Sequence, residues 1–363
     1  MRIHVLGFAH TELTNQFASC AFSNRTMAFA TMMTRAGYDV VTYSGEASDA
    51  AAENVPLVTR AEQREWWPWY DPAGQVPYND FDSASPGWRV FTERAVAAIR
   101  ERAQPGDILA VTMGVTHRPI AERLPDLLPV ETGIGYSGVW APYRVFESTA
   151  WQSFLAAKEP TDDFRPFDAV IPRAYDPADF PAGRGGDSFL FIGRLTRRKG
   201  PSIAADACRR LGARLIVAGQ GMAKVEPGRI TCEDGTTLTG DVEYAGVVGP
   251  KERAELMGGA RAVFVPTLYF EPGGGVSIEA QMCGTPVITT DYACFLENVA
   301  QGLGGFRCST LADFTAAAES AASLDRPAIR EHALASWSFE ALAPRWTAYL
   351  ERLATLRGSG WYE

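Results

Sequence analysis

Two glutamates with seven residues between them, Glu271 and Glu279, frame the part of the sequence best equipped for chemistry. The intervening segment opens with Pro272 and three glycines, and glycine lets the backbone approach a ligand closely. Apolar spacing then predicts a helix over residues 276–283, whose first N–H groups and positive dipole end can bind a phosphate. An acidic residue near a helix start is also common in helices without a ligand. The pattern therefore needs support from elsewhere in the chain.

A cluster of cations provides that support. The apolar run at residues 189–192 leads directly into Arg194, Arg197, Arg198 and Lys199. Positive charge fixed at such a place stabilises a diphosphate leaving group with neither a proton nor a metal ion. For Arg197 and Arg198 taken singly, the preferred interpretation is a solvated basic turn.

Alternating strand and helix patterns surround both motifs. Short apolar runs predict strands, and the amphipathic stretches between them predict helices. This alternation is typical of an α/β domain whose ligands bind at the carboxyl ends of parallel strands. The expected strands are 189–192, 214–218, 242–245, 262–265 and 287–290, and the expected helices are 201–211, 250–258 and 276–283.

The first half of the chain shows the same alternation less regularly. Residues 59–88, rich in Trp, Tyr, Pro and Asp, are interpreted as an insertion or a long loop, and the glycine-rich residues 181–188 are interpreted as a linker. The sequence therefore predicts two α/β domains. The expected strands of the first domain are 2–6, 40–43, 107–112 and 169–172, and its expected helices are 24–36 and 91–102.

Composition limits the function classes. A chain of 363 residues with 46% hydrophobic residues has material for two cores. Its N-terminus lacks a signal-peptide pattern and no apolar run is long enough to span a bilayer, so a soluble, cytoplasmic protein is expected. The six cysteines include no CxxC pair, which favours reduced thiols over disulfides or a zinc site.

The formal net charge of −9 is unevenly distributed along the chain. Residues 1–180 contain 15 Arg and Lys against 23 Asp and Glu, so most of the negative charge lies there. The second half therefore has cations to spare for an anionic ligand. Binding to nucleic acid needs a basic surface, so the acidic first half counts against such a partner without excluding a local basic groove.

Taken together, these motifs resemble the family-four retaining glycosyltransferases, also called glycosyl transferases group 1. Glu271 and Glu279 match that family's Glu, seven residues, Glu motif, and Arg194 and Lys199 match its Gly-Arg and Lys-Gly pairs. The resemblance implies that Glu271 contacts hydroxyls of the donor sugar and Glu279 the ribose of the nucleotide. It also implies that Arg194 and Lys199 grip the donor diphosphate. Further donor-site residues implied by the resemblance are Gly193, Gly219, Val247, Gly273, Gly274, Gly275 and Val276.

The resemblance covers most of residues 165–355 and implies a GT-B fold, in which two Rossmann-like α/β domains face a cleft. Cys294 stands where a glycine is common in the family, and Arg173 and Ala174 stand where Asn-Gly is usual. The expected boundaries are an acceptor-side domain at 1–180, a linker at 181–188, a nucleotide-sugar-binding domain at 189–335, and a C-terminal helix at 336–363 that packs back on the first domain.

Site residues in the first domain follow from the resemblance less directly. Retaining members can carry a histidine near the sugar at the place of His117, although a loop histidine without a role fits the sequence equally well. Aromatic residues in a polar loop can stack on sugars or bases, or can simply cover the domain edge. The residues assigned to the acceptor side are His10, Trp67, Trp69, Gly135, Tyr136 and Arg144.

The resemblance implies retaining transfer of a hexose from a nucleoside-diphosphate sugar, with UDP-sugars favoured, to a hydroxyl of a small molecule or glycan. No cofactor or metal ion is expected, because protein cations would neutralise the leaving group. Two alternatives stay open. One is a glycosyltransferase acting on a hydroxymethylated base in DNA, since the first half also resembles bacteriophage-encoded enzymes. The other is a sugar-nucleotide binding protein without transfer activity; a sugar-nucleotide epimerase resembles the pattern less well.

Overall fold

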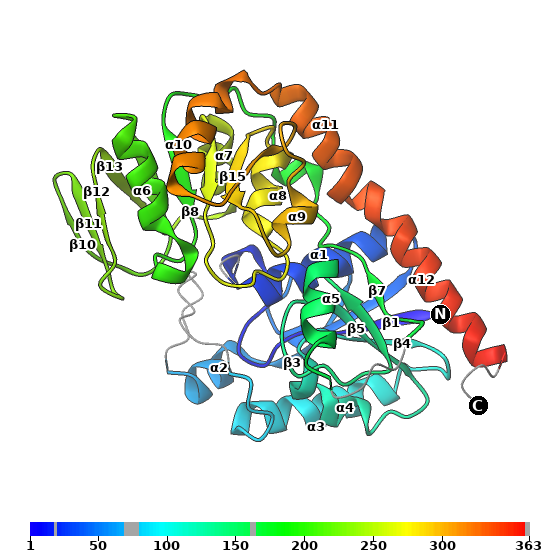
Figure 1. Ribbon diagram of the computed structural model, residues 1–363. Coiled ribbons are helices and arrows are strands. Elements are labelled where there is room, and N and C mark those ends of the chain that lie inside the picture. The colour runs from blue at the N-terminus through cyan, green and yellow to red at the C-terminus, as the bar shows by residue number, and fades with distance from the viewer. Residues whose placement is uncertain (18–19, 69–79, 160–164, 360–363) are drawn as a thin grey trace. The chain divides into compact units, whose positions relative to one another are not determined.

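The computed structural model describes residues 1–17, 20–68, 80–159 and 165–359 (Figure 1). The chain forms two compact units, each with its own parallel sheet. Unit 1 comprises residues 1–147, 152–174 and 339–363, and unit 2 comprises residues 148–151 and 175–338. The segment expected as a linker, 181–188, thus clusters with unit 2. In the described part of the chain, no helix is both long and apolar enough to cross a membrane.

Unit 1 is built on a seven-stranded sheet in the order β3-β2-β1-β4-β5-β6-β7, and every neighbouring pair is parallel. Strands β4 and β6 are buried throughout, as expected where helices cover both faces of a parallel sheet. The strands are β1 (Arg2–Leu6), β2 (Asp39–Gly45), β3 (Glu53–Val58), β4 (Ile108–Val111), β5 (Leu128–Ile134), β6 (Tyr143–Phe146) and β7 (Ala169–Val170).

The helices of unit 1 surround one large core. α12 (Phe339–Ser359) places Leu342, Trp346, Tyr349 and Leu353 on one face at helical spacing, and these side chains are buried in the core of unit 1. Phe29 meets the Trp346 ring edge-on, with centroids 4.8 Å apart. The C-terminal helix is therefore a structural part of unit 1. The other helices are α1 (Ala21–Arg35), α2 (Arg60–Trp66), α3 (Pro86–Arg100), α4 (Arg118–Ala121) and α5 (Thr149–Ala156), whose first turn clusters with unit 2.

Unit 2 has a six-stranded parallel sheet in the order β13-β9-β8-β14-β15-β16. Alternation along β8 (Phe189–Ile192) explains how it is covered. Phe189 and Phe191 pack with α6 and α10 on one face, while Leu190 and Ile192 pack with α7, α8 and α11 on the other. The remaining strands are β9 (Leu215–Ala218), β13 (Val242–Gly246), β14 (Val263–Val265), β15 (Val287–Thr290) and β16 (Gly305–Cys308). The helices are α6 (Pro201–Arg210), α7 (Pro250–Gly259), α8 (Gly275–Met282), α9 (Phe295–Asn298), α10 (Leu311–Ser320) and α11 (Arg326–Trp337).

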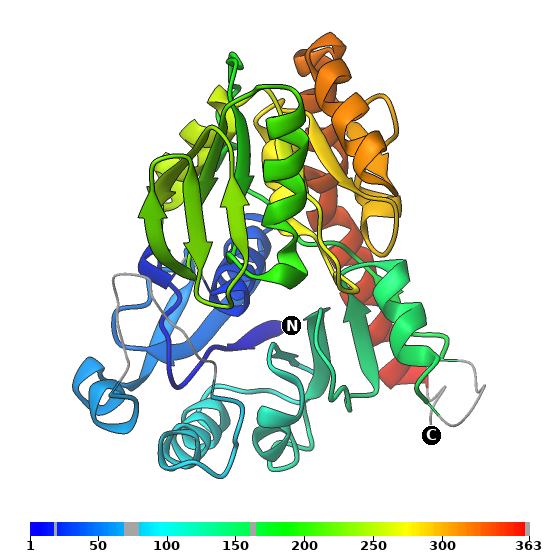
Figure 2. The same cartoon turned by 60° about the vertical axis from the view of Figure 1, so that its left-hand side comes forward.

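A second, antiparallel sheet of three strands lies beside α6 (Figure 2). Its strands are β10 (Met222–Glu226), β11 (Arg229–Cys232) and β12 (Thr237–Thr239), none of which was expected from the sequence. Ile230 and Leu238 anchor it in the core that α6 shares. The turns contain Gly228 and Gly235, both at positive φ, so the Pro-Gly and Asp-Gly pairs of the sequence were the available signal.

One expectation about unit 1 is corrected by the structure. Residues 59–88 are not simply a loop, because they contain α2 and the start of α3. The Thr59 hydroxyl accepts from the N–H of Glu62, whose carboxylate accepts from the N–H of Thr59, and this capping box fixes the start of α2.

Candidate functional site

The strand order of unit 2 identifies the place where a ligand is expected. Strand β8 has β9 on one side and β14 on the other. The chain runs from β8 to β9 and later returns to β14, so the connections diverge between the neighbouring strands β8 and β14. In open parallel sheets, ligands bind outside the carboxyl ends of the strands at such a divergence. The cation segment follows β8 and the Glu271 loop follows β14, so both sequence motifs reach this place.

Glycines allow the carboxyl ends of β8, β9 and β13 to approach one another. A Cβ on Gly219, which has φ of +135°, would lie 1.9 Å from the carbonyl oxygen of Gly193. The N–H of Gly219 donates to the carbonyl of Gly246 at 2.8 Å, and the N–H of Gly193 donates to that of Ala218 at 3.0 Å. A larger residue at Gly219 would therefore force these turns apart.

Lys199 and Glu271 meet at the divergence point. The Lys199 ammonium lies 2.6 Å from Glu271 Oε2 and donates to the Tyr269 hydroxyl at 2.8 Å. The Lys199 side chain is 28% exposed and that of Glu271 is 13% exposed, so the pair is largely screened from water yet open on one side. Lys199 and Glu271, both assigned from the sequence to the binding of one donor sugar nucleotide, are thus in direct contact.

Tyr269 organises the basic turn around this pair. Arg198 lies with its guanidinium carbon 3.9 Å from the centroid of the Tyr269 ring, and the Lys199 ammonium is 4.8 Å from the same centroid. Burial, reinforced by the charge of Glu271, raises the pKa of Tyr269, so its hydroxyl stays neutral. Arg198 is exposed, as the solvated basic turn predicted from the sequence requires, and its guanidinium also lies over the Tyr269 ring.

The glycine-rich loop is shaped by packing at the start of α8. Gly274 caps the helix with φ of +58°, and a Cβ there would lie 2.8 Å from the Cys294 sulfur. Asn298 Nδ2 donates to the carbonyl of Gly273 at 2.8 Å, and the Ser277 hydroxyl donates to that of Gly274 at 2.7 Å. The loop that contains Glu271 leads through these glycines into α8, whose first N–H groups begin at Gly275.

Glu279 occupies the second turn of α8 and is buried, with only 3% of its side chain exposed. Arg253 of α7 lies 3.4 Å away, measured from Nε to Glu279 Oε2. Within the described residues, neither of these two atoms has a hydrogen-bond partner. A buried carboxylate oxygen without a hydrogen bond is costly, which makes this oxygen ready to accept from a ligand hydroxyl.

The other expected donor-site residues lie at the same edge of the sheet. Arg194 is exposed directly after β8, and Val247 is 38% exposed in the turn that follows β13. Val276 is half-buried in the first turn of α8. Among the described residues, no three His, Cys, Asp or Glu side chains gather in an arrangement that could hold a metal ion.

Three of the residues assigned in unit 1 lie together in its core. His117 is fully buried against the rings of Phe8 and Trp88, with centroids 6.2 and 5.5 Å away. His10 and Trp67 are 1% and 5% exposed and meet edge-on at 5.9 Å. Burial lowers the pKa of His117 to about 3, so the ring is neutral. As placed, these side chains pack against one another, and their roles toward a substrate stay predictions.

The remaining acceptor-side residues are dispersed. Gly135 and Tyr136 are half-buried after β5, where the Tyr136 hydroxyl donates to Glu131 at 2.9 Å. Arg144 is buried in β6 and binds the Asp168 carboxylate through two nitrogens, with Glu159 as a further partner. Two carboxylates therefore already compensate the charge of Arg144. Trp69 lies outside the described residues.

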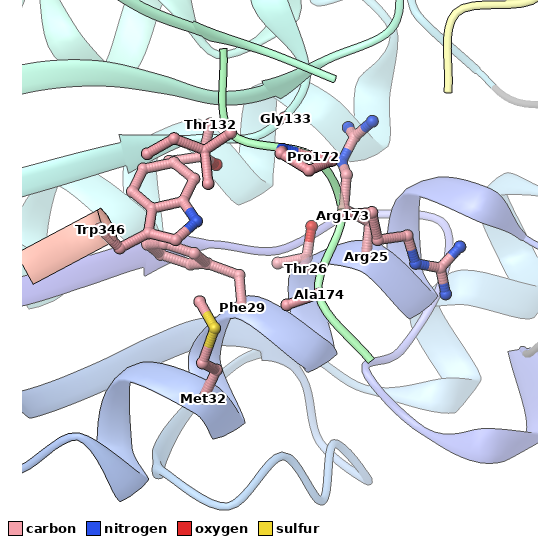
Figure 3. Close-up of a pocket in the computed structure, with 11 residues that line it drawn as sticks. Arg25, Thr26, Phe29, Met32, Thr132, Gly133, Pro172, Arg173, Ala174 and Trp346 are labelled. Atoms are coloured by element: carbon pink, nitrogen blue, oxygen red, sulfur yellow. The ribbon is translucent and has the colours of Figure 1, made fainter. Parts of the chain in front are cut away.

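A small cavity in unit 1 has the volume of a packing gap and not of a substrate site (Figure 3). Trp346 and Phe29 lie at one end and Arg25 and Arg173 at the other. Its volume is about 20 Å³, room for roughly one water molecule. The lining residues are Arg25, Thr26, Phe29, Met32, Thr132, Gly133, Ile171, Pro172, Arg173, Ala174 and Trp346.

Sequence reasoning missed two residues of the site in unit 2. Tyr269 stands two positions before Glu271, and that spacing within the motif loop was the available signal. Arg253 stands 26 residues before Glu279 on a different helix, and nothing in the sequence links the two. Both side chains become visible as partners only once the strands bring α7, α8 and the loop after β14 together.

Comparisons with known proteins find related sequences for part of this chain. Residues 177–330 match the model of the family described as glycosyl transferases group 1. The chain is also similar to D-inositol 3-phosphate glycosyltransferases of Mycobacterium tuberculosis and Mycobacterium bovis, with 33% identity over 120 residues. That aligned segment covers 32% of this chain and 25% of the length of those relatives.

Solved structures show the same fold over nearly the whole chain. One is a glycosyltransferase involved in avilamycin A biosynthesis, with 20% identity, a TM-score of 0.69 and 98% coverage of both chains. Another is the Thermosynechococcus elongatus sucrose-phosphate synthase, with 15% identity, a TM-score of 0.68 and coverage of 98% of this chain and 99% of that one. A third is Anabaena HepE, solved with UDP and glucose, with 13% identity, a TM-score of 0.67 and coverage of 97% and 99%. The fold of the chain is thus the GT-B fold, and its residues 177–330 match the model of the glycosyl transferases group 1 family.

Proposed function

We propose that the chain is a retaining, metal-independent glycosyltransferase that moves a hexose from a nucleoside-diphosphate sugar to an acceptor hydroxyl. The observation that carries this proposal is the cluster of Lys199, Tyr269 and Glu271, formed by the loops that follow β8 and β14 at the divergence point of the unit 2 sheet. The family match over residues 177–330 and the UDP complexes of HepE support a UDP-sugar as donor. The names of the similar proteins support a small molecule or a glycan as acceptor.

The diphosphate would bind between Arg194, Lys199 and the first N–H groups of α8. All three supply positive charge or N–H donors at one edge of the sheet. Donors and charges fixed before the reaction stabilise charge that develops on the leaving group. Protein groups would therefore do what a bound metal ion does in other transferases.

Glu271 is the counter-ion of Lys199 in the structure, and a diphosphate would compete for the same ammonium. When Lys199 turns toward the diphosphate, the Glu271 carboxylate becomes available to accept hydrogen bonds from sugar hydroxyls. Tyr269 remains as a neutral partner for Lys199 during this exchange. The exchange would couple diphosphate binding to orientation of the sugar at the reacting carbon.

Retention is proposed to follow a front-face route, in which the leaving phosphate helps to remove the proton of the acceptor hydroxyl. The new glycosidic bond then forms on the face from which the diphosphate leaves. An oxocarbenium-like transition state would be stabilised by the leaving diphosphate, itself held by Arg194 and Lys199.

Two measurements test the proposal. Thermal stability of the purified protein would be screened against UDP-, GDP-, ADP- and dTDP-sugars, because a ligand at a hundred times its Kd adds about 2.7 kcal/mol to the stability. Release of the nucleoside diphosphate from the best donor would then be followed with and without EDTA. Release that persists in EDTA supports the proposal, while complete loss restored by magnesium or manganese would refute metal independence.

A further inference from the structure

Arg253 makes the ion pair with the buried Glu279 carboxylate. It lies in the first turn of α7, and 18% of its side chain is exposed. Its Nε is 3.4 Å from Glu279 Oε2, a contact close enough for charge compensation but without a hydrogen bond between these two atoms. The carboxylate thus has a counter-charge and still has room for hydrogen-bond donors from a ligand.

Two other arginines near the end of α8 donate hydrogen bonds to backbone carbonyls. Arg326 donates to the carbonyls of Gly258 and Ala260, and Arg330 donates to the carbonyl of Phe180. In the part of the chain that the structure describes, the cation within ion-pair distance of Glu279 is therefore Arg253. Removing one partner of a buried pair leaves an uncompensated charge, which is strongly unfavourable.

We propose that Arg253 is a positioning residue that orients Glu279, so that this carboxylate selects ribonucleoside over 2′-deoxyribonucleoside diphosphates. The inference rests on the proposed function, which places the ribose at Glu279. An ionised carboxylate only accepts hydrogen bonds, and a ribose offers two adjacent hydroxyl donors, 2′ and 3′. A 2′-deoxyribose offers one, and leaves an acceptor unpaired on a carboxylate whose side chain is only 3% exposed.

The test compares dissociation constants for matched nucleotide pairs by titration calorimetry. UDP and 2′-deoxy-UDP, GDP and 2′-deoxy-GDP, and ADP and 2′-deoxy-ADP are titrated into the full chain, and the pair that binds most tightly is used thereafter. We expect the ribonucleotide to bind at least about tenfold more tightly, a ratio that corresponds to about 1.4 kcal/mol. In Arg253→Met, the ratio should fall to about threefold or less, and Arg253→Lys should restore part of it.

A matched control comes from the same helix. Lys251 is 92% exposed and lies two residues before Arg253, so Lys251→Met should leave both dissociation constants unchanged. In a Glu279→Gln background, Arg253→Met should not change the ratio further, because the carboxylate that Arg253 serves is absent. This double variant buries no unpaired charge, so it also serves if Arg253→Met alone does not fold.

The outcomes separate this inference from the proposed function. If the folded Arg253→Met protein binds nucleotides with the wild-type ratio, or if Arg253→Met still changes the ratio in the Glu279→Gln background, the positioning role of Arg253 is overturned. The proposed function would survive both results. If no nucleoside diphosphate binds to the wild-type chain, the proposed function falls and takes this inference with it.

Discussion

Replacing Lys199 by alanine removes the cation at the centre of the unit 2 site. The side chain joins the loop after β8 to the loop after β14 through its contacts with Tyr269 and Glu271. It is 28% exposed, so its removal opens no sealed cavity and the fold should persist. The expected effect therefore falls on chemistry rather than on folding.

The size of the effect follows from the charge that is lost. Two unit charges 4 Å apart near a protein surface interact by about 4 kcal/mol at an effective dielectric constant of roughly 20. Arg194 and the start of α8 would remain, so part of this stabilisation should survive. A loss of about 2.7 kcal/mol in the transition state corresponds to a hundredfold lower turnover, within the range for removal of one preorganised donor.

The assay is steady-state release of nucleoside diphosphate from the best donor, with folding checked by circular dichroism. Arg197→Ala is the matched control, since Arg197 lies in the same turn and is exposed. We expect near wild-type turnover for the control and a decrease of about a hundredfold or more for Lys199→Ala. Turnover of Lys199→Ala equal to that of Arg197→Ala would refute the role of Lys199 at the diphosphate.

Two other predictions concern Tyr269 and His117. Tyr269→Phe keeps the ring under Arg198 but removes the hydroxyl that Lys199 contacts. Turnover should therefore fall about tenfold with an unchanged melting temperature. An unchanged turnover would contradict the role of Tyr269 in positioning Lys199. Burial lowers the pKa of His117 to about 3, so the unfolded chain binds the extra proton and stability should fall as the pH drops from about 6.5 toward 3. Urea unfolding should show a shallower pH dependence, by up to about 1.4 kcal/mol per pH unit, in His117→Gln; equal slopes would refute the assignment.

Strands that consist of one continuous apolar run were predictable from the sequence. The expected strands 2–6, 189–192 and 287–290 coincide with β1, β8 and β15, because each is a continuous apolar run bounded by turn residues. The start of α2 was missed although Thr59 and Glu62 have the spacing of a capping box. The aromatic-rich composition of residues 59–88 favoured a loop, although the capping-box spacing of Thr59 and Glu62 indicated a helix start.

Side-chain partnerships between distant segments were not predictable. The sequence identified Lys199 and Glu271 as site residues, but their direct pairing depends on β8 and β14 being neighbours in the sheet. His117 follows a strand end, as a ligand-binding residue would, yet the aromatic side chains of α3 enclose it. Burial of this kind depends on how helices pack over the sheet, and a single sequence carries little information on that.

The measurement that tests the central claim most directly compares Glu271→Gln with Glu279→Gln in nucleotide binding and in turnover. Glu271 should act on the sugar and not on the nucleotide, so Glu271→Gln should bind the free nucleoside diphosphate within about twofold of wild type while turnover falls about a hundredfold. Glu279→Gln should weaken that binding by about tenfold or more, because a contact to the ribose is present in ground and transition states alike. The opposite pattern by calorimetry on folded variants, or no effect of either substitution on binding or turnover, would contradict the claim that these two carboxylates act on different parts of one donor.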